Sequence, residues 1–173
     1  MRITISGHIG SGKSTVATVL SNLTGYPIYS GGYFFRAKAK ELNVSLTEYN
    51  IMMEKDSAED RKLNDSIGKF LLEHNNIIVE SRLAGWIASK SGISAFKVFL
   101  DAPLEVREMR INGRSDHENA LEMKKREESE DLRFLEYFGF RMDDTSIYDA
   151  VIDTTEGNAD YVAGKIYRLA FPS

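Results

Sequence analysis

A glycine-rich run near the start of the chain has the residue types that bind phosphate groups. Gly7 and Gly12 enclose four residues and are followed by Lys13 and Ser14. Glycines let backbone N–H groups turn inward around phosphate oxygens, and a helix beginning near Lys13 adds the positive end of its dipole. This P-loop pattern predicts that Lys13 bridges the β- and γ-phosphates of ATP and that Ser14 binds Mg²⁺. The residues expected to surround the ATP phosphates are Gly7, His8, Ile9, Gly10, Ser11, Gly12, Lys13, Ser14 and Thr15.

The sequence on both sides of the glycines supports this interpretation. Residues 2–6 form a β-branched run that indicates a buried strand, and residues 13–23 have helical spacing. The alternative is a tight turn without a binding role. It is disfavoured because a strand before the glycines and a helix after them are what a P-loop requires. A dinucleotide-binding motif does not fit, because Thr15 stands where its third glycine belongs.

Two classes of P-loop protein need to be separated, switches or motors on one side and small-molecule kinases on the other. The Asn-Lys-x-Asp motif that reads guanine is absent. Residues 65–68 fit the Asp-x-x-Gly pattern of switches, but they lie within a helical pattern and do not follow a strand. The chain is also short for a motor, at 173 residues. We therefore expect a kinase that acts on a small acceptor.

Several arginines are placed where phosphoryl transfer needs positive charge. The migrating phosphoryl group must be neutralised and shielded from water by segments that close over it. A single arginine is more often a surface charge, so the placement of the whole set is the informative feature. Arg82 follows a buried strand, at the edge where a parallel sheet opens into a ligand crevice. The set comprises Arg36, Arg82, Arg107, Arg110, Arg114, Arg126 and Arg133.

Glu80 is the last residue of the predicted strand 76–80 and has two interpretations. In the first, its carboxylate holds Mg²⁺ through water, and the predicted metal ligands are then Ser14 and Glu80. An ordinary strand-end charge explains it equally well. Both interpretations stay open on the sequence alone.

Strands and helices alternate along the chain. This alternation predicts an α/β fold in which helices cover both faces of a parallel sheet, within one domain spanning 1–173. Two stretches without a core strand, about 31–74 and about 110–127, are expected to project from the sheet. The expected strands are 2–6, 28–29, 76–80, 96–100 and 150–153, and the expected helices include 13–23, 46–55, 117–137 and 159–169.

Composition limits the function classes. The chain has 42% hydrophobic and 28% charged residues, as in ordinary globular proteins. A net charge of −4 argues against a nucleic-acid or anionic-membrane surface. The absence of cysteine excludes disulfides, thiolate zinc sites and cysteine nucleophiles. No segment has the pattern of a signal peptide or a membrane span, so we expect a cytoplasmic protein. We also expect a monomer, and an oligomer stays open as the alternative.

Taken together, these motifs resemble archaeal-type cytidylate kinases, within the nucleoside monophosphate kinases. The resemblance covers nearly the whole chain. It implies a P-loop NTPase fold with five parallel strands, a monophosphate-binding insertion over about 31–74 and a lid over about 110–127. It also implies transfer of the ATP γ-phosphate to CMP or dCMP. The segments that carry it are 3–15, 30–36, 79–85, 107–111, 126–133 and 148–154.

The resemblance assigns acceptor-binding roles to six residues. Arg36 matches the arginine that holds the acceptor phosphate, and Ser30 lies before it at the pocket mouth. Arg82 matches an arginine that faces the acceptor nucleotide. A pattern of Arg-x-x-x-Asp/Glu-x-x-Arg, which grips sugar and phosphate, is matched by Arg126, Glu130 and Arg133. These three share one helical face, although the residues alone would favour a solvent-exposed salt bridge between Arg126 and Glu130.

The resemblance also assigns residues to the ATP side. Arg110 and Arg114 match lid arginines that close over ATP, so with Lys13 they are the predicted catalytic residues. Thr154 follows the last predicted strand. Residues at this place usually contact the adenine of ATP in such kinases. In bacterial relatives an aspartate after the third strand reads cytosine, but here the residue is Leu83. Base selection must therefore rest elsewhere.

Two alternatives remain open. One is a P-loop kinase for another monophosphate or for a metabolite such as shikimate, although the arginine set suits a doubly charged acceptor better than a neutral alcohol. The other is a nucleotide-dependent P-loop protein that associates with RNA or regulates partners. The negative net charge disfavours this second alternative.

Overall fold

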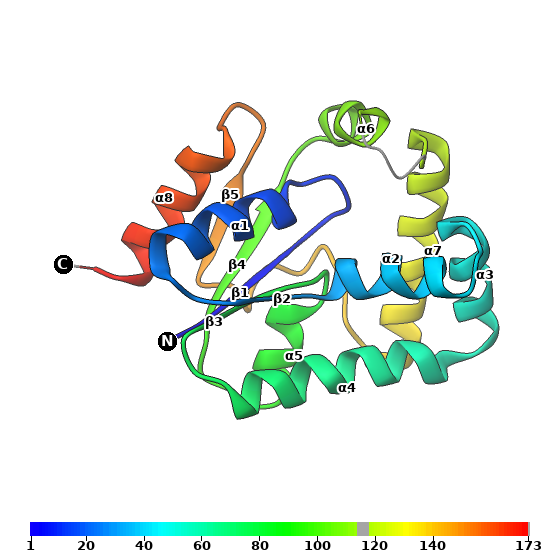
Figure 1. Cartoon of the computed structure of the whole chain (residues 1–173), viewed down its shortest axis with the longest axis horizontal. Helices are drawn as coiled ribbons and strands as arrows, with labels where there is room; N and C mark the ends of the chain where they lie inside the picture. Colours follow the sequence, from blue (N-terminus) through cyan, green and yellow to red (C-terminus); the bar gives the residue numbers. More distant parts are fainter. Residues whose placement is uncertain (114–117, 173) are drawn as a thin grey trace.

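Five parallel strands form the central sheet of the computed structural model, which describes residues 1–113 and 118–172 (Figure 1). The strand order is β2-β3-β1-β4-β5. Every neighbouring pair is parallel, so all the carboxyl ends lie at one edge of the sheet. The α/β fold and the five strands expected from the sequence are confirmed. The strands are β1 Arg2–Gly7, β2 Ile28–Ser30, β3 Ile77–Glu80, β4 Phe96–Asp101 and β5 Ala150–Asp153.

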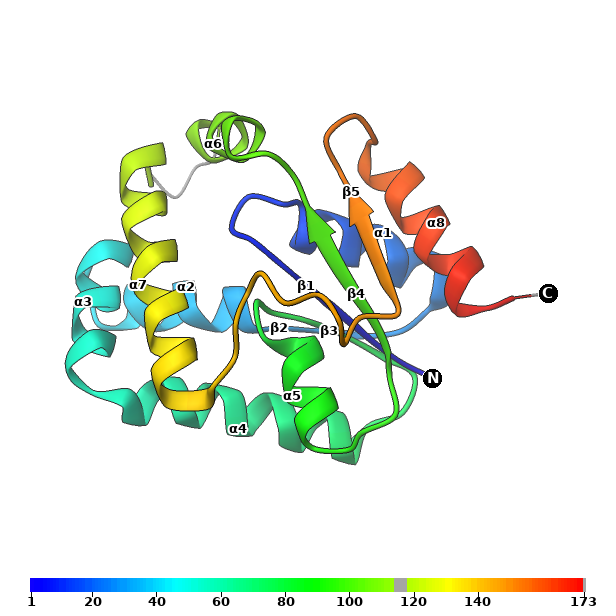
Figure 2. The ribbon, with the colours of Figure 1, turned by 180° about the vertical axis from the view of Figure 1, so that it is seen from behind.

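Helices cover both faces of this sheet. α1 (Lys13–Thr24) and α8 (Ala159–Ala170) lie on one face, and α4 (Ser57–Glu73) and α5 (Ala84–Lys90) on the other (Figures 1 and 2). Successive strand residues point to opposite faces. In β3, Ile78 belongs to the core under α1 and α8, whereas Val79 belongs to the core under α4 and α5. These two cores give the three-layer arrangement.

The sequence patterns do not predict helix α5. It has seven residues, and four of them are buried. A helix this short has too few turns for apolar periodicity to distinguish it from a loop. Its amide at Gly85 donates to the Ser6 hydroxyl of β1 at 2.9 Å, which ties its start to the central strand.

The remaining helices lie beyond the carboxyl ends of the strands (Figure 1). They are α2 (Gly31–Glu41), α3 (Leu46–Lys55), α6 (Leu104–Asn112) and α7 (Ala120–Phe138). The predicted helix over 46–55 is confirmed, and it starts with a reciprocal capping box between Ser45 and Glu48. Helix α7 starts later than the predicted residue 117, because a second capping box joins Asn119 to Glu122.

The stretch 31–74 does not project from the sheet over its whole length. Its last helix, α4, buries Ile67 and Leu71 in the core against the sheet, while α2 and α3 form a separate small core with Ala39, Tyr49 and Met53. The division into an acceptor insertion and a lid stays a prediction. None of the helices described in residues 1–113 and 118–172 is long and apolar enough to cross a membrane.

Candidate active site

The P-loop connects β1 to α1 and has a backbone that requires glycine. Gly10 and Gly12 adopt φ of 81° and 93°, in the left-handed region. A Cβ atom added at Gly10 would lie 2.9 Å from the carbonyl oxygen of Arg107. Gly12 occupies the N-cap of α1, so no side chain caps the first turn. The amides at this end of α1 are therefore suited to an anion.

Lys13 begins α1 and crosses the loop. Its Nζ atom donates to the carbonyl oxygens of Gly7 at 3.0 Å and His8 at 2.7 Å. An ammonium group has three rotatable donors, so phosphate oxygens can replace these carbonyls as acceptors. Ser14 and Thr15 are exposed in the first turn of α1. The phosphate-binding role expected of these residues stays a prediction.

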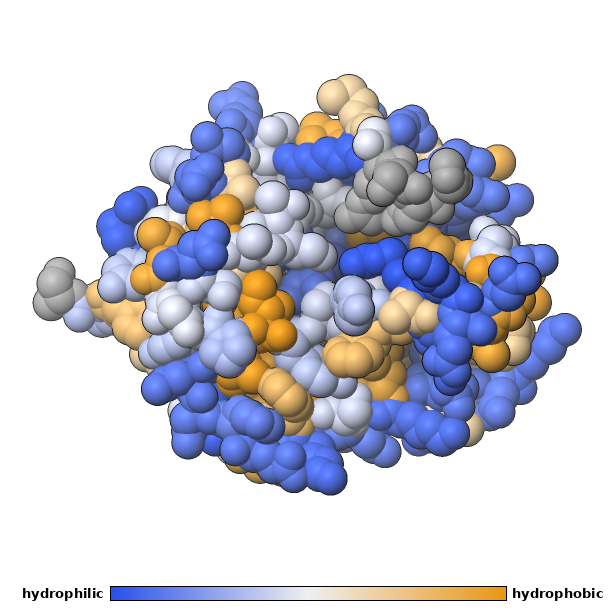
Figure 3. Space-filling view, viewed as in Figure 1, coloured by the Kyte–Doolittle hydropathy of each residue, from blue (hydrophilic) through white to orange (hydrophobic). Residues whose placement is uncertain are grey.

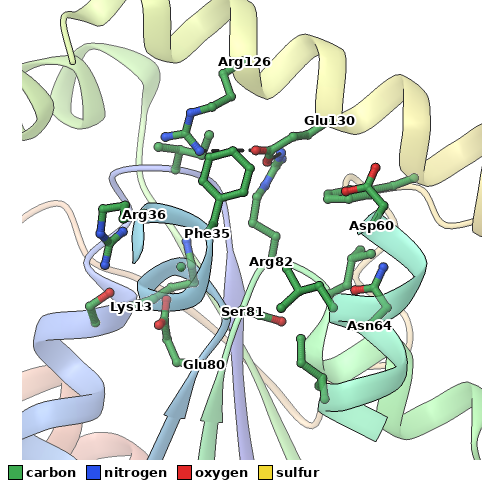
Figure 4. A pocket seen from close by; sticks show the side chains of 18 of the residues that line it. Lys13, Phe35, Arg36, Asp60, Asn64, Glu80, Ser81, Arg82, Arg126 and Glu130 are labelled. Carbon is green, nitrogen blue, oxygen red and sulfur yellow. Dashed lines mark hydrogen bonds and ion pairs between the residues drawn. The ribbon is translucent and has the colours of Figure 1, made fainter. Parts of the chain in front are cut away.

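A pocket lies beside the P-loop at the carboxyl edge of the sheet. Residues of the P-loop, α2, α4, α7 and the end of β3 line it. The surface is hollowed between the part that carries α1 and the part that carries α2 and α3 (Figure 3). Among its described lining residues, cations outnumber carboxylates and favour an anionic ligand. The cations are Lys13, Arg36, Arg82, Arg126 and Arg133, and the carboxylates are Asp60, Glu80 and Glu130 (Figure 4).

Arg82 extends from the end of β3 towards α7 (Figure 4). It donates to Glu130 at 2.7 Å and to Asp131. Glu130 also accepts from Arg126 at 3.2 Å. Burial raises the pKa of Glu130, but the charges of Arg82 and Arg126 outweigh burial and hold that pKa below its usual value. The pair of Arg126 and Glu130 therefore exists, but it lines a pocket and is not a solvent-exposed pair.

Glu118 is a second partner of Arg126 that the sequence did not indicate. Its two carboxylate oxygens accept from Arg126 at 2.7 and 2.8 Å. The Glu118 side chain is 2% exposed, so this bidentate pair is shielded from water. Burial lowers the pKa of Arg126, but Glu130 and Glu118 outweigh it and raise that pKa. Arg126 is thus held in place on the wall of the pocket.

Arg133 joins α7 to two helices of the 31–74 stretch. It donates to Asp60 of α4 at 2.7 Å and to Asn50 of α3 at 3.1 Å. The side chains of Arg133 and Asp60 are 5% and 6% exposed. Burial raises the pKa of Asp60 although Arg133 opposes it. Arg133 lines the pocket, and it also holds the helices around the pocket together.

Arg36 differs from the other arginines of the pocket. It lies near Lys13 (Figure 4) and is half-buried. Within 1–113 and 118–172, no carboxylate lies at ion-pair distance from its guanidinium, whereas Arg82, Arg126 and Arg133 each have one. A cation placed this way in a pocket is suited to an anionic group of a ligand.

Ser30 and Glu80 end the neighbouring strands β2 and β3. The Ser30 hydroxyl donates to Glu80 at 2.5 Å and accepts from the amide of Tyr33 at 3.1 Å, so it also caps α2. Glu80 is 2% exposed and lines the pocket together with Ser14. The described residues hold no group of three or more metal-ligating side chains. Two protein oxygens fit Mg²⁺, which usually keeps waters and substrate phosphates as its other ligands.

Arg110 and Thr154 both form hydrogen bonds to backbone carbonyls of the P-loop. Arg110 donates to the Thr154 hydroxyl at 3.0 Å and to the carbonyl of Gly10 at 3.2 Å. The Thr154 hydroxyl donates to the carbonyl of Ser11 at 2.9 Å, and Thr154 is 3% exposed. Closure of Arg110 over ATP and contact of Thr154 with adenine remain predictions. Arg114 lies outside the described residues.

Glu127 is a residue of the site that sequence reasoning missed. It accepts from the amide of Ile9 in the P-loop at 2.9 Å and from Arg107 at 2.9 Å, and it lies 3.2 Å from His8. Burial raises its pKa, but the contact with His8 and the charges of Arg82 and Arg107 outweigh burial and lower the pKa of Glu127 to about 2. The signal in the sequence was Arg107, a cation on the buried side of α6 that requires a partner.

Replacing Glu127 with glutamine should destabilise the protein by about 3 kcal/mol at pH 7, because it leaves the buried Arg107 without a counter-charge. The folded-state pKa of Glu127 lies below its ordinary value of 4.5. Its contribution to stability is therefore present above pH 4.5 and lost as the pH falls towards 2. Urea unfolding between pH 3 and 7 measures both effects.

The matched control is Glu128→Gln, because Glu128 is the exposed neighbour of Glu127 on α7. We expect this control to keep the stability and the acid dependence of the parent protein. Equal unfolding free energies for the two variants at pH 7 would contradict the role given to Glu127.

Comparison with known proteins finds relatives that match nearly the whole chain. The family described as the cytidylate kinase-like family matches residues 2–156. A cytidylate kinase of Thermoplasma acidophilum is 46% identical over 98% of this chain and 94% of its own length. A cytidylate kinase of Methanosarcina barkeri is 40% identical, with 100% of this chain and 97% of that protein covered.

Solved structures share the fold at low sequence identity. A gluconokinase from Sinorhizobium meliloti has a TM-score of 0.66 and 19% identity, over 98% of this chain and 93% of that one. A shikimate kinase from Acinetobacter baumannii has a TM-score of 0.63 and 16% identity, over 97% and 91%. These neighbours support the P-loop kinase fold alone. The match over 2–156 and the curated relatives show that the chain belongs to the cytidylate kinase-like family.

Proposed function

We propose that this protein transfers the γ-phosphoryl group of ATP to the phosphate of CMP or dCMP, which gives ADP and the corresponding diphosphate. The observation that carries the proposal is Arg36, a pocket cation beside the P-loop without a carboxylate partner in the described chain. A nucleoside monophosphate supplies the missing negative charge. The names of the curated relatives support the choice of CMP.

Catalysis in this proposal depends on positioning and electrostatics. The amides of the P-loop, the dipole of α1 and Lys13 hold the donor phosphates. Arg36 and the arginines on β3 and α7 orient the acceptor and neutralise its charge. No protein base is required, because a phosphate monoester is already an anion at neutral pH. Arg110 and Arg114 are proposed to close over ATP.

The donor set also fits Mg²⁺. Ser14 would bind it directly, and Glu80 would hold it through water. When bound, Mg²⁺ would supply positive charge against the negative charge of the phosphate oxygens. Glu80 already accepts a hydrogen bond from Ser30, so the same contact would fix its orientation for this task.

One assay tests the proposed reaction. We expect ADP release, measured with CMP, dCMP, UMP, AMP, GMP and shikimate as acceptors, to give the highest kcat/KM for CMP and dCMP. A higher value for shikimate would favour the metabolite-kinase alternative. Flat turnover across all six acceptors would contradict both kinase hypotheses, and hydrolysis stimulated by RNA would then support the regulatory alternative.

We also propose that the protein works as a monomer in the cytoplasm, where free nucleotides are its substrates. The net charge of −4 supports action on free nucleotides and not on nucleic acid or a membrane surface. Size-exclusion chromatography with light scattering tests the monomer. A stable dimer at assay concentrations would contradict it.

A further inference from the structure

The pocket has two chemically different ends. Lys13 and Arg36 lie at one end, and Asn64 of α4 lies at the other, with Ser81 at the base of the pocket (Figure 4). The cationic end suits the acceptor phosphate of the proposed reaction. The base of the acceptor must then lie towards Asn64, because the ribose separates it from the phosphate.

Apolar side chains enclose the end near Asn64. A planar base is suited to such walls, since its ring faces lose no hydrogen bonds on burial and only its edge requires polar partners. The pocket residues with this character are Leu63, Ile67, Leu83 and Phe134, which belong to one apolar cluster. Polar groups at this end therefore meet the edge of the base.

The amide of Asn64 is one such polar group. Asn64 is half-buried, and no hydrogen bond joins its side chain to another described residue. Asp60 lies one turn earlier on the same face of α4, and it is buried. Figure 4 shows the amide nitrogen of Asn64 on the side of Asp60 and the amide oxygen turned towards the pocket. The negative charge of Asp60 favours this orientation, because it attracts the donor end of the amide.

The hydroxyl of Ser81 is the other polar group. Ser81 is 7% exposed, and its Oγ atom has no hydrogen-bond partner among the described residues. Buried polar groups normally have a partner, so this hydroxyl points to a ligand atom. A hydroxyl both donates and accepts, and it therefore binds a base edge without deciding which base is bound.

We infer that Asn64 selects a 4-amino pyrimidine, an inference that rests on the function proposed above. The Asn64 carbonyl oxygen accepts a hydrogen bond from the 4-amino group of cytosine, and Ser81 donates to an acceptor on the same ring. Uracil presents an oxygen at position 4, which would face the Asn64 oxygen with no proton between them. The position after Arg82 is held by Leu83, which cannot make such a contact. Asn64 thus supplies the selectivity from α4.

The experiment compares kcat/KM for CMP and UMP in the parent protein, Asn64→Ala and Asn64→Asp. We expect the parent to favour CMP by roughly 10- to 100-fold, the cost of an unpaired buried acceptor. Asn64→Ala should bring the ratio close to one, mainly through loss of CMP activity. Asn64→Asp should keep the preference, because both carboxylate oxygens accept hydrogen bonds and the side chain has nearly the same shape.

A matched control is Asp65→Ala, since Asp65 is the exposed neighbour of Asn64 on α4 and does not line the pocket. It should keep the parent ratio. A parent ratio close to one, an unchanged ratio in Asn64→Ala, or a ratio that falls to one in Asn64→Asp would each overturn the inference. Failure of the proposed function is distinct, because the parent protein would then not phosphorylate CMP.

Discussion

Replacing Lys13 with alanine should lower kcat by about 10³-fold and leave the fold intact. The Lys13 ammonium lies over the P-loop at the start of α1 and bonds to the carbonyls of Gly7 and His8. In the proposed reaction it would shift to the β- and γ-phosphates and stabilise charge as the phosphoryl group migrates. Steady-state kinetics with CMP and ATP measure the effect, and thermal unfolding checks the fold.

The control for this variant is Lys165→Ala, which removes an exposed lysine from α8, on the face of the sheet that also carries α1. It should keep the parent kcat. Near-normal turnover in Lys13→Ala would exclude the proposed mechanism, whereas a loss of folded protein would leave Lys13→Arg as the variant to measure. An arginine keeps the charge but not the compact ammonium, so a kcat reduced by at least tenfold is expected there.

Features that depend on neighbouring residues were predictable from the sequence. The P-loop and the capping box at Ser45 and Glu48 are complete within a few residues, and the structure contains both. The strands also followed from local apolar runs, because a parallel sheet is buried on both faces. The predicted start of α7, residue 117, is too early because local composition does not mark the first turn of the helix. The charged residues before Asn119 continue the helical composition, although the capping box begins at Asn119.

Features that depend on contacts between distant residues were not predictable. Arg107 with Glu127 and Asp60 with Arg133 are ion pairs whose partners become neighbours only in the folded chain. The alternative of a solvent-exposed pair for Arg126 and Glu130 was reasonable from i,i+4 spacing. It is wrong about exposure, because α7 turns this face towards the pocket.

Helix α7 connects the parts of the site. Within two turns it carries Arg126 and Glu130 on the pocket, Glu127 on the P-loop and Arg133 on α3 and α4. A shift of this helix would therefore change both the acceptor pocket and the loop that binds the donor phosphates. The many buried ion pairs along α7 resist such a shift, because an uncompensated buried charge is costly.

Replacing Arg36 with alanine should raise the KM for CMP by roughly 100-fold, with a much smaller change in the KM for ATP. The loss corresponds to about 3 kcal/mol, the upper range for a hydrogen bond to a charged group. Arg36 gives a clean test, because its removal leaves no described carboxylate without a partner. Removal of Arg82 would leave Asp131 without its partner and Glu130 with Arg126 alone. Initial rates over a range of CMP concentrations give both constants.

Two further variants decide what the Arg36 result means. Arg36→Lys keeps a positive charge but loses the planar fork that binds two phosphate oxygens, so its KM for CMP should lie between those of the parent and Arg36→Ala. Lys40→Ala removes an exposed cation from the same helix, and it should leave the KM for CMP unchanged if the effect is local to the pocket. Equal increases in Arg36→Ala and Lys40→Ala would indicate a general loss of positive charge. An unchanged KM in Arg36→Ala would remove Arg36 from the acceptor site, and the case for a phosphate acceptor would then depend on arginines that already have carboxylate partners.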